Sequence, residues 1–122
     1  MSAPQMVCHL ADAFRMALGQ KTAKPRSTLL GRTMVKWVAL YAPLPWPSGL
    51  LTSEEIDQER GGGTAPGEFA ADVAQVEALL QLVTAPARRL EHLHPVFGPM
   101  SDAAWLRWGY LHTDHHLRQF GA

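Results

Sequence analysis

The chain has 122 residues, enough for one domain with a buried core, and we treat residues 1–122 as a single domain. Lysine plus arginine equals aspartate plus glutamate, 11 against 11, which argues against the charged surface that nucleic acid or membrane partners require. Hydrophobic residues make up 47% of the chain, which is typical of a globular protein and argues against disorder.

The cysteine content and the apolar stretches predict a soluble cytoplasmic protein. The single cysteine, Cys8, excludes an internal disulfide and favours a reducing compartment. The first 20 residues are amphipathic and carry charged side chains, unlike a signal peptide. The longest uncharged stretch contains Pro43, Pro45 and Pro47, which would break a membrane-spanning helix.

The first half of the chain predicts one strong helix and two weaker ones. The strong helix begins at Ser2, where serine, proline and Gln5 form a capping pattern, and it ends at Gly19. Residues 27–40 predict a weaker helix that the following prolines end. The pattern of residues 52–55 opens one or two further turns.

The second half predicts two well-patterned helices. The first covers residues 66–83 after the glycine-rich stretch 60–68, which we expect to be a flexible connector. A loop follows, and the last helix runs from Asp102 to about Phe120, capped by Ser101. Because no strand alternation competes with these patterns, the sequence predicts an all-α helical bundle.

Histidines near the C-terminus are spaced as metal ligands. His112 and His116 stand four positions apart, so both imidazoles lie on one side of a helix. This side also carries apolar residues and Gln119, which suggests that it faces the interior. His115 lies about 100° away on the flank. We expect it to support the site or to lie on the surface.

A third ligand has to come from another helix, and His9 is the best candidate. It shares the inner side of the first helix, where an unpaired imidazole would be costly. Three imidazoles would leave coordination positions open, as in catalytic sites, and would suit zinc, nickel or iron(II). The alternative is that His9 is a hydrogen-bonded core histidine and that the C-terminal pair is a frayed surface end.

Other catalytic motifs fit poorly. A zinc-protease helix needs glutamate after its first histidine, and Thr113 stands there. Cys8 and His9 are adjacent and would not face each other on a helix, so we expect Cys8 to be a buried small hydrophobic residue.

The chain resembles the DinB-like (YfiT-like) superfamily of metal-dependent proteins, and within it a branch known as a domain of unknown function. The resemblance rests on "MVCHLADAFRMALG", "GEFAADVAQVEALL" and "HPVFGPMSDAAWLRWGYLHTDHHLRQFG". It implies an up-down-down-up four-helix bundle with one histidine from the second helix and an HxxxH pair from the fourth, followed by a glutamine. The matching positions are His9, His112, His116 and Gln119; Gln119, like His115, would support the site.

The resemblance also implies that this chain is short by the family's first helix. The apolar sides of residues 6–18 and 69–80 would then be exposed, which predicts a homodimer or aggregation. The alternative is that residues 27–40 fold over the gap and leave a monomer.

The family includes metal-dependent thiol transferases, an isomerase that acts with a low-molecular-weight thiol, and members without a known reaction. The resemblance therefore implies a metal-dependent hydrolase or thiol transferase that acts on a small molecule or low-molecular-weight thiol. No carboxylate is spaced as an obvious general base, so the chemistry would depend on the metal. Tyr110, Arg118 and His94 are possible assistants. The alternative is a non-catalytic binding or interaction module that keeps the bundle.

Overall fold

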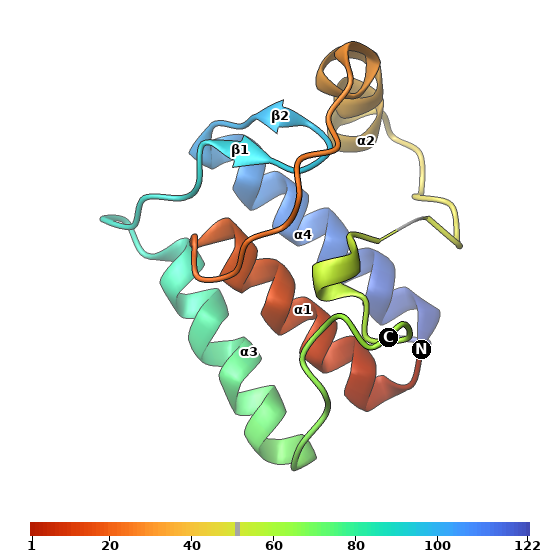
Figure 1. Cartoon of the computed structure of the whole chain (residues 1–122), viewed down its shortest axis with the longest axis vertical. Helices are drawn as coiled ribbons and strands as arrows, with labels where there is room; N and C mark the ends of the chain where they lie inside the picture. Colours follow the sequence, from red (N-terminus) through yellow and green to blue (C-terminus); the bar gives the residue numbers. More distant parts are fainter. Residues whose placement is uncertain (51) are drawn as a thin grey trace.

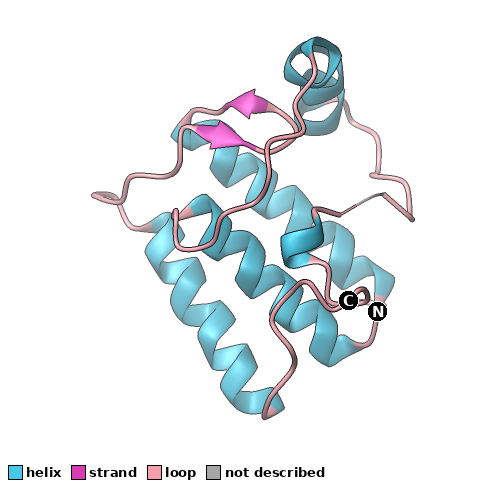
Figure 2. Ribbon diagram, in the orientation of Figure 1, coloured by secondary structure: helices cyan, strands magenta, loops and turns pink. Residues whose placement is uncertain are grey.

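The computed structural model describes residues 1–50 and 52–122 of the chain. Three long helices form the body: α1 (Ala3–Ala17), α3 (Phe69–Thr84) and α4 (Asp102–Gln119). Figure 1 shows α1 between the other two, parallel to α3 and antiparallel to α4, and Figure 2 shows how little strand accompanies the helices. The all-α prediction is confirmed.

The central position of α1 follows from its composition, because a helix that is apolar on most sides is buried on most sides. The Ser2 hydroxyl accepts from the Gln5 backbone N–H and the Gln5 side chain accepts from the Ser2 N–H, as the capping pattern predicts. Every residue from Met6 to Phe14 is buried. Apolar residues of α3 pack along one side of α1: Val73, Val76, Leu79 and Val83.

This burial corrects the expected exposure of the apolar side of residues 6–18. Met6, Val7 and Leu10 are all buried, and Val73 and Val76 of α3 pack against them. The short helix η2 (Glu54–Ile56) also lies beside α1 (Figure 1). The apolar side of α3 is partly exposed, as expected, since Phe69 and Leu80 are each about half exposed.

The weak helix predicted for residues 27–40 forms as two joined pieces. A π-helical turn, η1 (Gly31–Val35), continues into α2 (Lys36–Tyr41). Gly31 is needed for this packing, because a Cβ there would lie 2.9 Å from the Val96 carbonyl oxygen. Leu40 is completely buried in the core, whereas most of the segment is exposed.

A small hairpin that the sequence did not predict precedes α4. Strands β1 (Leu93–His94) and β2 (Gly98–Pro99) pair antiparallel. His94 Nδ1 accepts hydrogen bonds from the Val96 and Phe97 backbone N–H groups, both at 3.1 Å, and thereby closes the turn. Strands of two residues are too short to produce the alternation that predicts a strand.

The segment between η2 and α3 is held against α1. Asp12 accepts hydrogen bonds from the Thr64 N–H and hydroxyl at 2.8 and 2.7 Å. Thr64 thus ties the expected flexible connector to α1 at one point, although nearly all of residues 60–68 are exposed. Among the described residues, no helix combines the length and apolar character needed to cross a membrane.

Candidate metal centre

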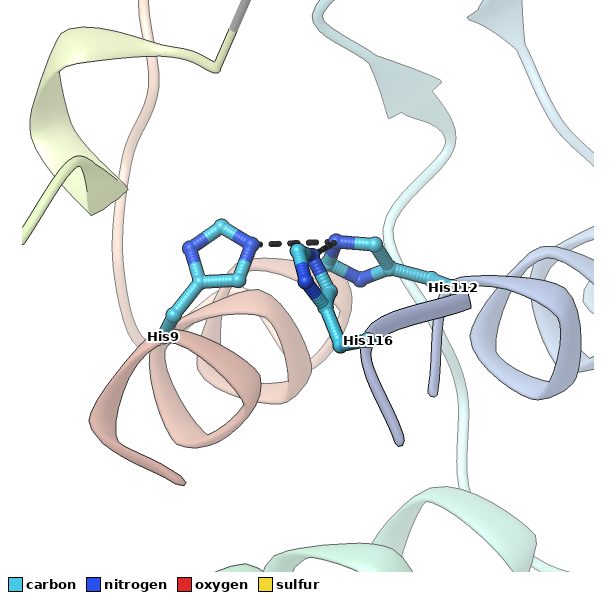
Figure 3. A group of neighbouring side chains, drawn as sticks. All are labelled: His9, His112 and His116. Carbon is cyan, nitrogen blue, oxygen red and sulfur yellow. Dashed lines mark hydrogen bonds between the residues drawn. The ribbon is translucent and has the colours of Figure 1, made fainter. Parts of the chain in front are cut away.

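The antiparallel packing of α1 and α4 brings three histidines together (Figure 3). His9 comes from the first half of α1, and His112 and His116 lie one turn apart near the end of α4. All three side chains are buried, with 1%, 9% and 8% of their surface exposed. The two predicted histidine groups, from opposite ends of the chain, thus share one site.

The three rings meet at their Nε2 atoms. His112 Nε2 lies 3.0 Å from His9 Nε2 and 3.1 Å from His116 Nε2. One ligand atom from each ring can be chosen so that all three lie within 4.8 Å of one another. Imidazole ligands at about 2.0–2.1 Å from a tetrahedral ion stand about 3.3 Å apart, so these separations fit a common ion.

Hydrogen bonds on the far side of two rings fix their tautomers. His9 Nδ1 donates to the Ile56 carbonyl oxygen at 2.7 Å, and His116 Nδ1 donates to Gln119 Oε1 at 3.1 Å. A neutral imidazole with its proton on Nδ1 has a lone pair on Nε2. Both lone pairs are therefore directed at His112 Nε2, where a shared proton or a cation is needed to offset their repulsion.

The environment keeps these rings neutral, which is the state that binds metal. Burial lowers the pKa of His9, although the Ile56 carbonyl and the Gln58 side chain raise it in part. Burial and the neighbouring histidines hold the pKa of His112 well below its usual range. Burial and then His9 lower the pKa of His116 to about 4.

Aromatic and amide side chains surround the rings on α4. Trp108 stacks on His112 with ring centroids 4.7 Å apart. Gln119 lies between two histidines, because its Oε1 accepts from His116 and its Nε2 donates to His115 Nε2 at 3.2 Å. His115 thus contacts the site through Gln119. Trp46 lies beside His115, at a centroid distance of 5.9 Å.

The other residues considered from the sequence lie away from the triad. Tyr110 is 69% exposed, and Arg118 forms a surface ion pair with Asp114 at 2.7 Å. His94 is buried in the hairpin, where it satisfies backbone groups of its own turn. Cys8 is buried, as predicted.

A pocket of about 190 Å³ lies beside His9. The segment 52–60 forms most of its wall, through Thr52, Gln58 and three charged residues: Asp57, Glu59 and Arg60. Sequence reasoning missed the contribution of this segment. Local patterns predict its turns and not its approach to His9.

A family model described as the DinB superfamily matches residues 1–120. This match covers nearly all of the chain and includes all three histidines. No curated protein and no solved structure matches the chain.

Proposed function

The chain belongs to the DinB superfamily, and from this premise we propose that it is a metal-dependent hydrolase or thiol transferase. In this proposal His9, His112 and His116 are the ligands of a divalent zinc, nickel or iron ion. The main support is the convergence of three buried Nε2 atoms, two of them in rings whose Nδ1 proton is already engaged. The role of these three histidines as metal ligands remains a prediction.

A bound divalent ion would lower the pKa of a water or thiol that it binds, or would polarise a carbonyl group. The chain itself supplies the orientation of the ligands. The Ile56 carbonyl and Gln119 hold the His9 and His116 rings through their Nδ1 atoms. Trp108 covers one face of His112 and excludes water from it.

The size and position of the pocket support a small substrate. At about 190 Å³ it is smaller than the 300–1,000 Å³ common for ligand pockets, so it suits a small polar molecule or the reactive end of a low-molecular-weight thiol. A reducing cytoplasm, proposed from the single cysteine, would keep such a thiol reduced.

A non-catalytic metal-binding module is the second candidate. It is favoured by the contacts of the pocket carboxylate Asp57, which lies 3.6 Å from Arg60 and accepts hydrogen bonds from the Glu59 and Arg60 backbone N–H groups at 3.1 Å. These contacts make Asp57 less available as a base.

Turnover separates the two functions. Zinc-, nickel- and iron-loaded protein should be assayed against a panel of thiol-transfer and ester substrates, beside His112→Ala treated in the same way. Activity that disappears with His112 supports the enzyme. A metal-loaded protein with no turnover on any member of the panel supports the binding module.

A further inference from the structure

Asp12 is an ionised side chain in the core, one helical turn after His9 on α1. Its carboxylate is completely buried and accepts hydrogen bonds from Gln58 Nε2 at 2.8 Å and from the Thr64 N–H and hydroxyl. Two cations, Arg15 and Lys21, pair with it at 3.0 Å each. Although burial raises its pKa, the hydrogen bonds from Thr64 and Lys21 hold the pKa below its usual value. Asp12 is therefore a stable anion that anchors other groups.

The anchored groups belong to the segment that contacts His9. Gln58 and Thr64 come from this segment, and so does Ile56, whose carbonyl accepts from His9 Nδ1 at 2.7 Å. Asp12 thus fixes the position of the carbonyl that selects the His9 tautomer. Because Asp12 lies one turn from His9, the contacts of both residues with this segment fall on the same part of α1.

The Gln58 amide has only one orientation that satisfies Asp12. A carboxylate can only accept, so Nε2 must face Asp12 and Oε1 must face away. Oε1 is buried and has no hydrogen-bond partner among the described residues. Gln58 lines the same pocket as His9. A Cβ at Gly63 would lie 2.2 Å from Nε2, so glycine at this position leaves the room that the amide occupies.

We propose that Asp12 and Gln58 are positioning residues of the metal site: the carboxylate fixes the amide, and the unpaired amide oxygen stabilises the positive charge that a cation brings to His9. A buried acceptor without a partner is unfavourable in a folded protein and calls for an explanation. A cation held by His9, which lines the same pocket, supplies one. The inference rests on the proposed metal site, and it makes the metal affinity depend on Gln58.

The test compares two identical substitutions in the full chain. Gln58→Met removes the amide and keeps the length of the side chain, whereas Gln75→Met makes the same change on α3, where Gln75 contacts Arg15. Zinc affinity is measured by competition with a chelator, and the helical circular dichroism is measured in parallel. Residues that orient metal ligands commonly change affinity by about 10–100-fold, so we expect that loss for Gln58→Met and an unchanged affinity for Gln75→Met.

A second readout needs no variant. On zinc loading of the wild-type protein, the carbon-13 signal of the Gln58 side-chain carbonyl should move, and that of Gln75 should stay in place. This measurement decides the matter if Gln58→Met does not fold. A Gln58 signal that stays in place, or equal zinc affinities for the two variants, would overturn the inference.

The design separates this inference from the proposed function. If the wild-type protein binds no zinc, nickel or iron, the metal site itself is refuted and the inference with it. If the wild-type protein binds metal and Gln58→Met binds it equally well, only the positioning role is refuted.

Discussion

His9 and His112 are 103 positions apart in the chain, yet their Nε2 atoms lie 3.0 Å from each other. The approach depends on α1 and α4 running antiparallel, which places the first half of α1 beside the end of α4. His9 Nδ1 donates to the Ile56 carbonyl, so its Nε2 is the free atom. The helix packing and the tautomer together direct a lone pair at the second histidine.

Two histidines of α4 provide a matched test of the ligand assignment. His112→Ala should abolish zinc binding, because it removes the nitrogen that lies between the other two. His115→Ala makes the same change three residues later and should weaken zinc binding by about 10-fold at most. His115 is hydrogen-bonded to Gln119 and its ring lies beside that of His116, but it is not one of the three grouped ligands. Calorimetry with zinc on the tag-free proteins checks both. Equal losses in the two variants would contradict the assignment.

The segment over α1 should be sensitive to a single added carbon. A Cβ at Gly62 would lie 1.9 Å from the Glu54 carbonyl oxygen, so Gly62→Ala must displace η2. We expect this variant to lose about 1–3 kcal/mol of unfolding free energy in urea. Gly67→Ala is the control, because its Cβ would make only an ordinary contact, 3.6 Å from Asp72 Oδ1. A Gly62→Ala protein as stable as Gly67→Ala would count against the packing.

Acid should destabilise the protein partly through His94. Burial and, to a lesser extent, Lys36 lower the pKa of His94 to about 3 in the folded chain, against 6.5 when it is free. The unfolded chain therefore takes up this proton first as the pH falls. Above pH 6.5 the titration of His94 does not lower the free energy of unfolding. Below pH 6.5 it lowers the free energy of unfolding by about 1.4 kcal/mol per pH unit, or about 2 kcal/mol by pH 5.

Urea unfolding at pH 7 and pH 5, with a chelator present, measures this dependence. His94→Asn should lose about 2 kcal/mol less between the two pH values than the wild-type protein, and the exposed His92→Asn should match the wild-type protein. The same pH dependence in His94→Asn and the wild-type protein would contradict the assignment to His94.

The helices and several of their ends could be predicted because the signals for them are local, although α3 begins at Phe69 and not at the predicted residue 66. Ser2 and Ser101 cap α1 and α4 as their sequence context indicates, and Gly19 has the positive φ of 74° that favours glycine. The spacing of His112 and His116 likewise depends only on helix geometry.

The support from Gln119 on α4 was expected from the resemblance, whereas the support from the segment before α3 could not be predicted, because it depends on contacts distant in sequence. Asp12 and Gln58 are 46 residues apart, and nothing local in either stretch indicates that they meet. His9 and Ile56 are also distant in sequence, and they meet through the Ile56 backbone carbonyl. Because every residue has such a carbonyl, the residue type at position 56 does not indicate this contact.

Self-association stays a prediction, and the structure changes the surface on which it depends. The apolar residues of α1 are buried, whereas Leu29, Met34 and Trp37 are 81%, 61% and 62% exposed, and Leu80 of α3 is 46% exposed. We expect a homodimer, since exposed apolar patches commonly mark interfaces. Light scattering should give twice the chain mass of 13.4 kDa. A single species of the chain mass that binds no hydrophobic dye would exclude the dimer.

The metal content of the tag-free protein tests the central claim most directly. After loading with zinc or nickel and desalting, mass spectrometry should find about one equivalent per chain. X-ray absorption should find three imidazole nitrogens at about 2.0–2.1 Å from the metal. Less than about 0.1 equivalent of metal would contradict the proposal that His9, His112 and His116 form a metal site.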